Sequence, residues 1–453
     1  ANTKAEQAGY TDNNQAVFAT FQLGYKSWAY LDLTARNDWF STLANTDNEK
    51  SGFFYPSVGI SAVVSEIVDL SKVYISFLKV RASYSEVGNP PMRQITVPTY
   101  AVKDGVVNTS SRLLNPDLKP ERTKSVEVGM NLRMFQNLLN IDFTYYNSNT
   151  FNQFINYTMP PSTGYSNYML NGGKVNNWGI EARLGINTNL GPVKWNSNLT
   201  FTMNRNKVIY LLPGGATNPI TGEPISITEI EPFNPQGSYK MIVKEGGTLS
   251  DIYVTGLKRD YQGNVKVNPQ TGSVETDPNT WIKAGSTAPR FNWGWNNSFS
   301  WKGINLSFLI DARIGGVGVS ATQAKMDYYG TSKKSAIVRE DGGVPVGGGR
   351  LTAEDYYKVA GSGMTGALAN YVYSMTNVRL REATLGYTFP TKWFGNQIQN
   401  LTVSLIGKNL FMFHNKAPFD PELSASTGTY YQGFDYFMQP SVRSIGFSVK
   451  FQY

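Results

Sequence analysis

The amino-acid sequence contains no cysteine and only one histidine, His414, among its 453 residues. Without cysteine there are no disulfides, no thiolate zinc clusters, no thiol nucleophile and no lipid attached through an N-terminal cysteine. With one histidine, catalytic triads and histidine-based metal sites are nearly excluded. We therefore expect the protein not to be an enzyme and to hold no metal or other cofactor.

Charged residues and long apolar runs are also scarce. Charged residues make up 16% of the chain and aromatic residues 13%, which is too aromatic for disorder and poor in charge for an ordinary soluble surface. The sequence has no run of about 18 apolar residues, which excludes a membrane-spanning helix. The net charge is +8, but the basic residues are dispersed. This pattern does not indicate nucleic-acid binding, and the positive balance is compatible with an anionic ligand without indicating one.

Apolar and polar residues alternate along most of the chain. For example, Leu139 and Ile141 share one face of a strand, while Asn140 and Asp142 share the other. This two-residue period predicts about thirteen strands, at 16–25, 29–36, 58–64, 78–84, 126–134, 138–145, 180–186, 195–203, 291–301, 304–312, 378–389, 401–405 and 447–453. The phase slips near Arg381, which predicts a β-bulge. No segment shows a convincing helical period, so we expect an all-β protein.

Strand length and the placement of charges favour a membrane. Many segments run for about ten residues, whereas strands in soluble sandwiches have about five or six and a bilayer requires about nine to eleven. Within each strand the charged residues lie on the face opposite the apolar one. This is expected if the apolar face contacts lipid, because a Lys or Arg side chain placed there destabilises a barrel by roughly 2 to 4 kcal/mol. A sandwich with one wet face shows the same alternation. The residues expected to face the lumen or a plug are Asp32, Arg36, Arg81, Glu127, Arg133, Glu181, Arg183, Asp311 and Arg313.

The connections between strands alternate in length. Brief joints, such as those around Lys26 and at Lys302–Gly303, alternate with long ones, such as Asn206–Pro289 and Gly316–Tyr371. Short periplasmic turns and long extracellular loops are typical of an antiparallel transmembrane β-barrel in a bacterial outer membrane, and this order places the C-terminus in the periplasm. A hairpin turning at Asp260–Gly263 is expected in the first long loop, as an ornament or an extra barrel pair. The Gly-rich second loop is expected to be mobile.

Several longer strings resemble one protein family. They include Leu-Lys-Val-Arg-Ala-Ser-Tyr at Leu78–Tyr84, Asn-Pro-Asp-Leu-Lys-Pro-Glu-Arg at Asn115–Arg122, Arg-Leu-Arg-Glu at Arg379–Glu382, Gly-Lys-Asn-Leu-Phe at Gly407–Phe411 and Phe-Asp-Pro-Glu at Phe419–Glu422. In this order, these strings resemble the SusC-like (SusC/RagA) TonB-dependent outer-membrane transporters.

The resemblance implies a fold, a function and partners. The family forms a barrel of about 22 strands around an N-terminal plug and imports glycans or oligopeptides. It acts with a SusD-like surface lipoprotein and with TonB and its inner-membrane energising complex. Residues 1–453 are then expected to be the C-terminal portion of the barrel, roughly 13 to 15 strands, with the plug domain and early strands absent from this chain. An odd strand count also cannot close a single-chain bacterial barrel.

Two questions of function stay open at this stage. The sequence does not distinguish a glycan from a peptide as the cargo. The alternative to an importer is a soluble or secreted β-rich module that binds carbohydrate or acts as an adhesin, and a passive porin is a third, weaker interpretation. Extraction behaviour separates the first two, because a barrel needs detergent.

Aromatic residues of the long loops are the candidate substrate contacts. Residues next to strands, such as Trp39 and Phe40, fit an aromatic belt at the lipid headgroups. Tyrosines deeper in the loops can stack on sugar rings or peptide side chains. The candidates are Tyr165, Tyr168, Tyr328, Tyr329, Tyr356, Tyr357, Tyr430, Tyr431 and Tyr436.

Two further motifs lie near the end of the chain. Alternating apolar residues at the end of the chain resemble the signal by which outer-membrane barrels are recognised for assembly; they are Phe447, Val449, Phe451 and Tyr453. Asp420 and Glu422 lie in a loop with a proline between them, where paired carboxylates could act in catalysis or hold a cation. Turn formation is the favoured interpretation of this pair.

Overall fold

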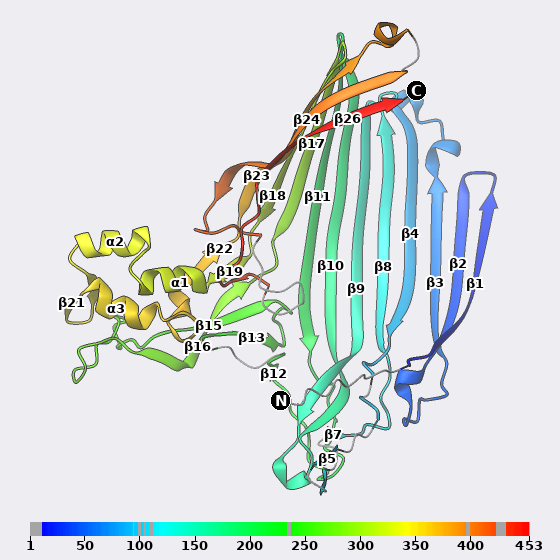
Figure 1. Cartoon of the computed structure of the whole chain (residues 1–453). Coiled ribbons are helices and arrows are strands. Elements are labelled where there is room, and N and C mark those ends of the chain that lie inside the picture. Colours follow the sequence, from blue (N-terminus) through cyan, green and yellow to red (C-terminus); the bar gives the residue numbers. More distant parts are fainter. Residues whose placement is uncertain are drawn as a thin grey trace, which may run out of the picture. The chain divides into compact units, whose positions relative to one another are not determined.

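The computed structural model describes residues 11–93, 95–97, 101–103, 106–108, 112–232, 237–395, 399–422 and 432–452. Thirteen strands follow one another along a single path in the main sheet (Figure 1). In the order of that path they are β1 (Asn14–Tyr25), β2 (Ala29–Phe40), β3 (Phe53–Val63), β4 (Ile75–Asn89), β8 (Glu121–Met134), β9 (Leu139–Thr158), β10 (Asn167–Leu190), β11 (Val193–Tyr210), β17 (Phe291–Trp301), β18 (Ile304–Ile314), β23 (Asn377–Phe389), β24 (Asn400–Asn415) and β26 (Ser444–Gln452). Each of the thirteen predicted segments overlaps one of these strands.

Contacts divide the chain into two units. The first comprises Ala1–Leu132, Thr144–Gly179 and Asn206–Thr228, and it contains β1 to β4. The second comprises Arg133–Phe143, Ile180–Arg205 and Glu229–Tyr453, and it contains β17, β18, β23, β24 and β26.

Strand register gives each pair of strands one apolar and one polar face. In the first unit, Leu31 lies opposite both Leu23 and Ile60, whereas Asp32 lies opposite Gln22 and Gly59. The second unit follows the same rule, since β17 and β18 pair Trp295 with Ile310 and Asn292 with Arg313, and β24 and β26 pair Val403 with Val449. A slip of one residue would exchange the two faces, so the alternation itself fixes the register.

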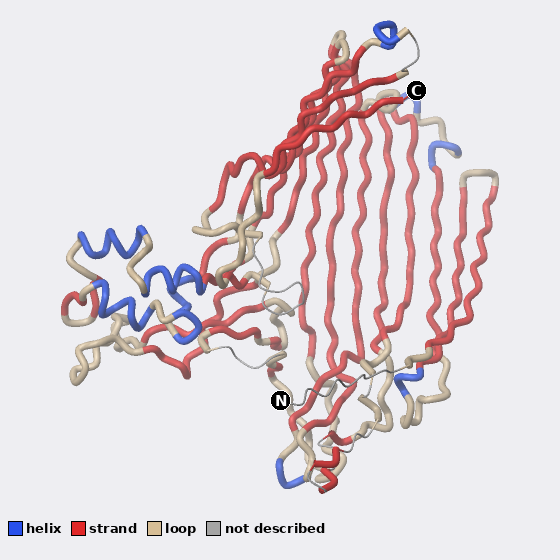
Figure 2. Tube along the Cα trace, viewed as in Figure 1, coloured by secondary structure: helices blue, strands red, loops and turns tan. Residues whose placement is uncertain are grey.

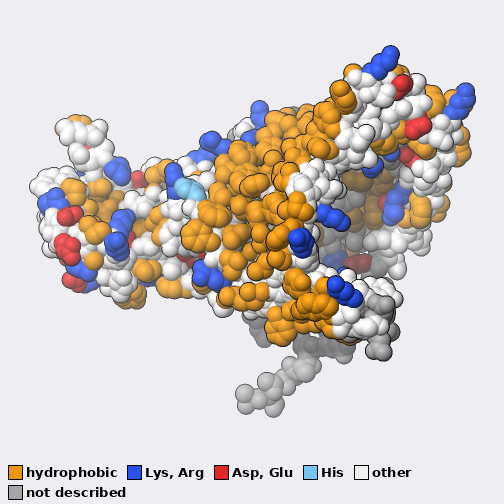
Figure 3. Space-filling model, turned by 90° about the horizontal axis from the view of Figure 1, so that it is seen from above, with side chains coloured by type: hydrophobic (Ala, Val, Ile, Leu, Met, Phe, Trp, Pro, Cys, Tyr) orange, Lys and Arg blue, Asp and Glu red, His pale blue; other side chains and the backbone are white. Residues whose placement is uncertain are grey.

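The apolar face of the sheet is exposed rather than packed. Ile60 is 57% exposed, Leu385 54% and Phe447 81%, and Figure 3 shows hydrophobic side chains gathered over much of the face that it displays. The buried hydrophobic clusters draw instead on loop segments and strand ends, such as those around Tyr239 and Met159. A soluble sandwich would bury its apolar flanks. This face is therefore the lipid-facing wall of a transmembrane antiparallel β-barrel.

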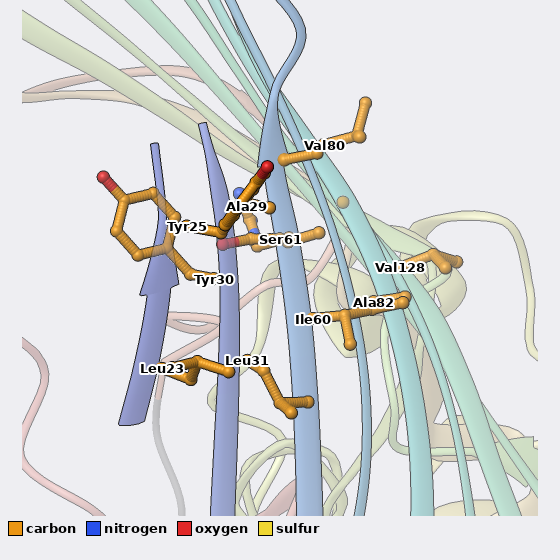
Figure 4. Close-up of a pocket in the computed structure, with 13 residues that line it drawn as sticks. Leu23, Tyr25, Ala29, Tyr30, Leu31, Ile60, Ser61, Val80, Ala82 and Val128 are labelled. Atoms are coloured by element: carbon orange, nitrogen blue, oxygen red, sulfur yellow. The ribbon is translucent and has the colours of Figure 1, made fainter. Parts of the chain in front are cut away.

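A shallow apolar hollow lies on this wall in the first unit. Its volume is about 750 Å³, and its lining includes Leu23, Leu31, Ile60, Ala82 and Val128 (Figure 4). These side chains come from β1, β2, β3, β4 and β8. Its hydrocarbon lining agrees with a surface that contacts lipid tails.

The predicted bulge is confirmed. Leu309 pairs with Glu382 and the next residue, Ile310, pairs with Leu380, so Arg381 is the extra residue between them. The register between β23 and β24 shifts at the same place. A bulge re-aims the side chains beside it, and this one lies next to the ion pairs described below.

Three short helices correct the expectation that no segment is helical. They are α1 (Ala321–Tyr328), α2 (Lys333–Glu340) and α3 (Ala353–Ala360), all within the connection expected to be a mobile loop (Figure 2). The side chains of Ser320, Ser332 and Thr352 cap them by accepting a hydrogen bond from the backbone N–H three residues later. Each helix has eight residues, too few for a helical period to stand out. In the described part of the chain, no helix combines the length and hydropathy needed to cross a membrane.

The remaining strands lie outside the thirteen-strand path, and all but β15 and β16 have at most four residues. They are β5 (Ala101–Lys103), β6 (Val106–Asn108), β7 (Arg112–Leu113), β12 (Glu229–Ile230), β13 (Tyr239–Met241), β14 (Val243–Lys244), β15 (Asp251–Leu257), β16 (Thr276–Ser286), β19 (Val317–Ser320), β20 (Val344–Val346), β21 (Gly349–Leu351), β22 (Val372–Ser374) and β25 (Phe434–Asp435). β13, β15 and β16 form a separate three-stranded sheet. The expected turn at Asp260–Gly263 is present, with the Asp260 N–H donating to the Asn264 carbonyl at 2.9 Å. This region is thus a loop ornament and adds no pair to the main sheet.

One expected loop proves to be mostly strand. The alternation of brief and long connections also predicts a long connection at 150–172, but β9 continues to Thr158 and β10 begins at Asn167. Long and brief connections still alternate elsewhere, as in the two residues Lys302 and Gly303 between β17 and β18 against residues 315–376 between β18 and β23. Extended backbone projecting beyond a membrane has the same sequence period as the spanning part, so periodicity alone does not show where the bilayer ends.

The two faces of β2 offer a matched test. Leu33 lies opposite Phe21 and Val58, and its neighbour Thr34 lies opposite Thr20 and Ser57. We expect Leu33→Lys to lower the free energy of unfolding in lipid vesicles by roughly 2 to 4 kcal/mol, because the ammonium group enters hydrocarbon. Thr34→Lys adds the same charge to the polar face and should cost far less. Urea titration followed by heat-modifiable migration on gels measures both, and equal losses would contradict this assignment of faces.

Candidate functional site

The polar face of the first unit gathers three of the residues expected to face the lumen. Asp32, Arg81 and Glu127 line a cavity of about 210 Å³, together with Lys79. Arg81 donates to the Asn131 side chain at 2.7 Å, and the Gln22 amide donates to Asp32 at 2.6 Å. This part of the wall is therefore a hydrogen-bonded polar surface that carries both charges.

The other predicted lumen residues are spread along the strands. Arg36 pairs with Asp38 at 2.9 Å, and Arg183 donates to the Asn198 amide oxygen at 2.9 Å. Arg133 and Glu181 are exposed on β8 and β10. The side chains that Arg36 and Arg183 contact are thus neighbouring polar residues that do not belong to the predicted lumen-facing residues.

An ion-pair network in the second unit joins two strands to a loop. Arg381 on β23 contacts Asp311 on β18 at 2.7 Å and also binds Glu422. Arg379 is 2% exposed and lies 3.1 Å from Glu422 and 3.6 Å from Asp420. Arg379 is the buried member of the network, and removing its acidic partners would leave an uncompensated buried charge, which is strongly destabilising.

Asp420 and Glu422 are held ionised by this network. Hydrogen bonding from Arg381 lowers the pKa of Glu422, and this outweighs the opposing effect of burial. Burial raises the pKa of Asp420, but hydrogen bonds from Ser441 and from the Glu422 backbone, together with the charge of Arg379, bring it below its usual value. The Asp420 side chain accepts from the Glu422 N–H at 3.0 Å, so a turn is formed as expected. Sequence analysis missed the ion pairs; the available signal was two arginines at alternate positions of β23.

The predicted substrate-contact tyrosines fall into different environments. Tyr168 is buried in a cluster with Met159 and Leu170, and Tyr356 and Tyr357 are buried in a cluster that includes Leu257. Burial raises the pKa of the hydroxyls of both Tyr356 and Tyr357. Those three rings therefore pack within the loops.

The remaining tyrosines are more accessible. Tyr329 is 70% exposed, Tyr436 is 47% exposed and Tyr165 is partly buried. Tyr328 and Tyr329 meet edge to face with ring centroids 4.9 Å apart. Tyr430 and Tyr431 lie outside the described residues, as does Tyr453 of the proposed assembly signal.

A polar cavity lies between the three helices. Its volume is about 430 Å³, and its lining includes Tyr328, Tyr329, Tyr357, Arg339 and Glu354. Three predicted tyrosines thus meet around one cavity, which sequence spacing alone did not indicate. Within the described residues, no group of three or more His, Cys, Asp or Glu side chains is placed to hold a metal ion.

A protein-family comparison decides the assignment. The family model described as TonB dependent receptor-like, beta-barrel matches residues 2–410. The chain belongs to this family. It is a family of outer-membrane transporters rather than enzymes, as the sequence predicted.

Curated relatives carry the same family name. TonB-dependent receptor P26 of Formosa agariphila is 27% identical over 476 residues, covering 96% of this chain and 46% of the relative. TonB-dependent receptor P3 of the same organism is 26% identical over 473 residues, covering 96% of this chain and 45% of the relative. The TonB-dependent receptor-like chain therefore spans less than half the length of these relatives.

Solved structures agree on the fold. The RagAB peptide transporter matches with a TM-score of 0.68 and 19% identity, covering 90% of this chain and 44% of that one. The RagAB peptide importer in the "open-open" state matches with a TM-score of 0.69 and 19% identity, over the same shares of the two chains. At this identity the likeness concerns the fold alone.

The ion-pair network predicts a pH-dependent loop contact. The Ser441 N–H donates to Asp420 at 2.9 Å. Because the folded-state pKa values of Asp420 and Glu422 are lowered, their stabilisation is complete above the ordinary values of 3.8 and 4.5 and is lost as the pH falls through the lower folded values. We expect the hydrogen-exchange protection factor of the Ser441 amide to fall on acidification.

The control is an amide without a carboxylate acceptor. The Arg290 N–H donates to the Ile314 carbonyl at 2.7 Å, and its protection factor should change little over the same pH range. Glu422→Gln should lower the protection of Ser441 at neutral pH and flatten its pH dependence. Parallel behaviour of the two amides in the unmodified protein would show that the network does not hold the loop.

Proposed function

We propose that this chain is the C-terminal portion of the barrel of a TonB-dependent nutrient importer that takes up glycans or oligopeptides. One observation carries the proposal: each strand presents an exposed apolar face, and a polar face that bears Asp32, Arg81, Asp311 and other charged groups. A wall of this kind can sit in lipid and surround a hydrated passage. The greater length of the relatives supports a plug and earlier strands in the full protein.

The partners follow from the same family. A SusD-like surface lipoprotein would cover the extracellular side, and TonB with its inner-membrane energising complex would act through the plug. The titles of the RagAB structures describe a peptide transporter, and their likeness to this chain supports a barrel of that type. Phe447, Val449 and Phe451 are exposed on β26 and would serve, with Tyr453, as the assembly signal next to a periplasmic C-terminus.

The charged residues of the polar face have a proposed role in seating the plug. Asp32, Arg36, Arg81, Glu127, Arg133, Glu181, Arg183, Asp311 and Arg313 lie on this face by strand phase. Replacing a residue that packs against the plug should disturb the closure of the barrel by the plug before it changes which nutrient is imported. The exposed loop residues Tyr329 and Tyr436 are the better placed of the tyrosines to meet a ligand first.

Uptake in cells tests the importer. We expect deletion of the gene for the full-length protein to abolish growth on an oligomeric nutrient, while growth on its monomers continues, because monomers pass through porins. Inactivating TonB in the same strain should give the same defect. A passive pore would keep transporting without TonB, so TonB-independent uptake of the oligomer would contradict the proposal.

A further inference from the structure

Two arginines share one face of the sheet in the second unit. Asn292 on β17 lies opposite Arg313 on β18, and the Arg290 N–H donates to the Ile314 carbonyl at 2.7 Å. Arg290 lies in the bend just before β17, two residues from Asn292. Continuing the strand alternation by one residue places Arg290 and Arg313 on the same face as diagonal neighbours. Like charges placed this way repel each other unless an anion lies between them.

Neither guanidinium has an acidic partner of its own. Among the residues that the structure describes, neither Arg290 nor Arg313 forms an ion pair within 4.0 Å, whereas Arg379 and Arg381 form two each. Arg313 donates to the Thr287 carbonyl, while its Nε is buried without a hydrogen-bond partner. The charge of Glu422 acts on Arg313, but Glu422 already binds both Arg379 and Arg381. An unsatisfied buried donor is costly, and an anion bound close by would offset the charge of the guanidinium group that carries it.

A cavity lies directly beside this pair. Its volume is about 490 Å³, and the polar side chains of its lining are Arg290, Tyr373, Ser374 and Thr376. Gly316 also lines the cavity and has φ +81°; a Cβ there would lie 3.2 Å from a terminal guanidinium nitrogen of Arg313 and 2.8 Å from the Thr287 carbonyl oxygen. Arg313 itself does not line the cavity, but its terminal guanidinium nitrogen lies close behind Gly316, which does.

The side chains that line this cavity favour one chemical class of ligand. Arginine forms planar, paired hydrogen bonds with carboxylates, and the nearby hydroxyls can donate to the same group. The rest of the lining is glycine and the apolar side chains of Ile314, Val317 and Val372. A sugar ring presents hydroxyls in many directions that this lining would leave unpaired, whereas a carboxylate next to an aliphatic stem suits it.

We propose that Arg290 and Arg313 form a carboxylate-binding site for an acidic oligopeptide. This assignment rests on the proposed import function and narrows its substrate class. The site lies at the end of β18 that leads into the long connection 315–376, so the cargo would meet it on the extracellular side of the wall. A peptide that carries an acidic residue or a free C-terminal carboxylate would replace the missing counter-ion.

Calorimetry on the full-length protein in detergent tests the site. The probes are a tetrapeptide ending in two glutamates and the same peptide with glutamines and an amidated C-terminus. We expect Arg290→Gln to weaken binding of the acidic peptide about tenfold or more, because a charge-assisted hydrogen bond is lost, and to leave the neutral peptide unaffected. Arg290→Lys should give an intermediate loss, since it keeps the charge but not the planar fork.

Arg443→Gln is the matched control. Arg443 is exposed just before β26, and its replacement removes the same charge from the same unit. Equal losses in the two glutamine variants, or equal binding of acidic and neutral peptides by the unmodified protein, would overturn the site. Binding of oligogalacturonate, but not the acidic peptide, in an Arg290-dependent manner would overturn the peptide assignment. Because this assay needs no TonB, its failure is distinguishable from a failure of uptake.

Discussion

The structure depends on satisfying every backbone polar group by strand pairing while the two faces of each strand meet different media. Within a bilayer, an unpaired N–H or carbonyl has no water to bond, so strands must pair in register. The register also sets which side chains meet lipid. A shift of one residue in β2 would carry Asp32 to the lipid side and Leu31 to the polar side, and this cost enforces the observed pairing.

The polar face carries charged side chains close together, and these are stable only when each has a partner of opposite charge. In the second unit Arg381 has such partners. It lies at the bulge, pairs with Asp311 on the neighbouring strand β18 and also reaches the loop residue Glu422. A loop that begins far along the chain is thereby fastened to the wall. Among the described residues, Arg290 and Arg313 have no such acidic partners, and this difference from Arg379 and Arg381 is the basis for the proposed role in binding.

The family assignment and the local architecture were largely predictable. All thirteen main strands, the bulge at Arg381 and the alternation of most connections follow from a period of two residues and from charge placement. The helices were not predictable in this way, because eight residues make about two turns and their stability comes from packing against neighbours. Their capping residues, such as Ser320 and Thr352, were the only local signal. The boundary between spanning strand and projecting strand in β9 and β10 was also hidden, because the period does not change there.

The sequence by itself determined the strands, their faces and the membership of the TonB-dependent receptor-like barrel family, because these depend on neighbours within one strand or on continuous strings of residues. Only the tertiary structure decided which loop tyrosines are buried, as with Tyr356 and Tyr357, and which are exposed, as with Tyr329. It also decided that Glu422 meets Arg381 and that Gly316 lies beside Arg313. The reason is physical: such contacts join residues from different connections, and the folding of each connection onto the wall, rather than any local period, brings them together.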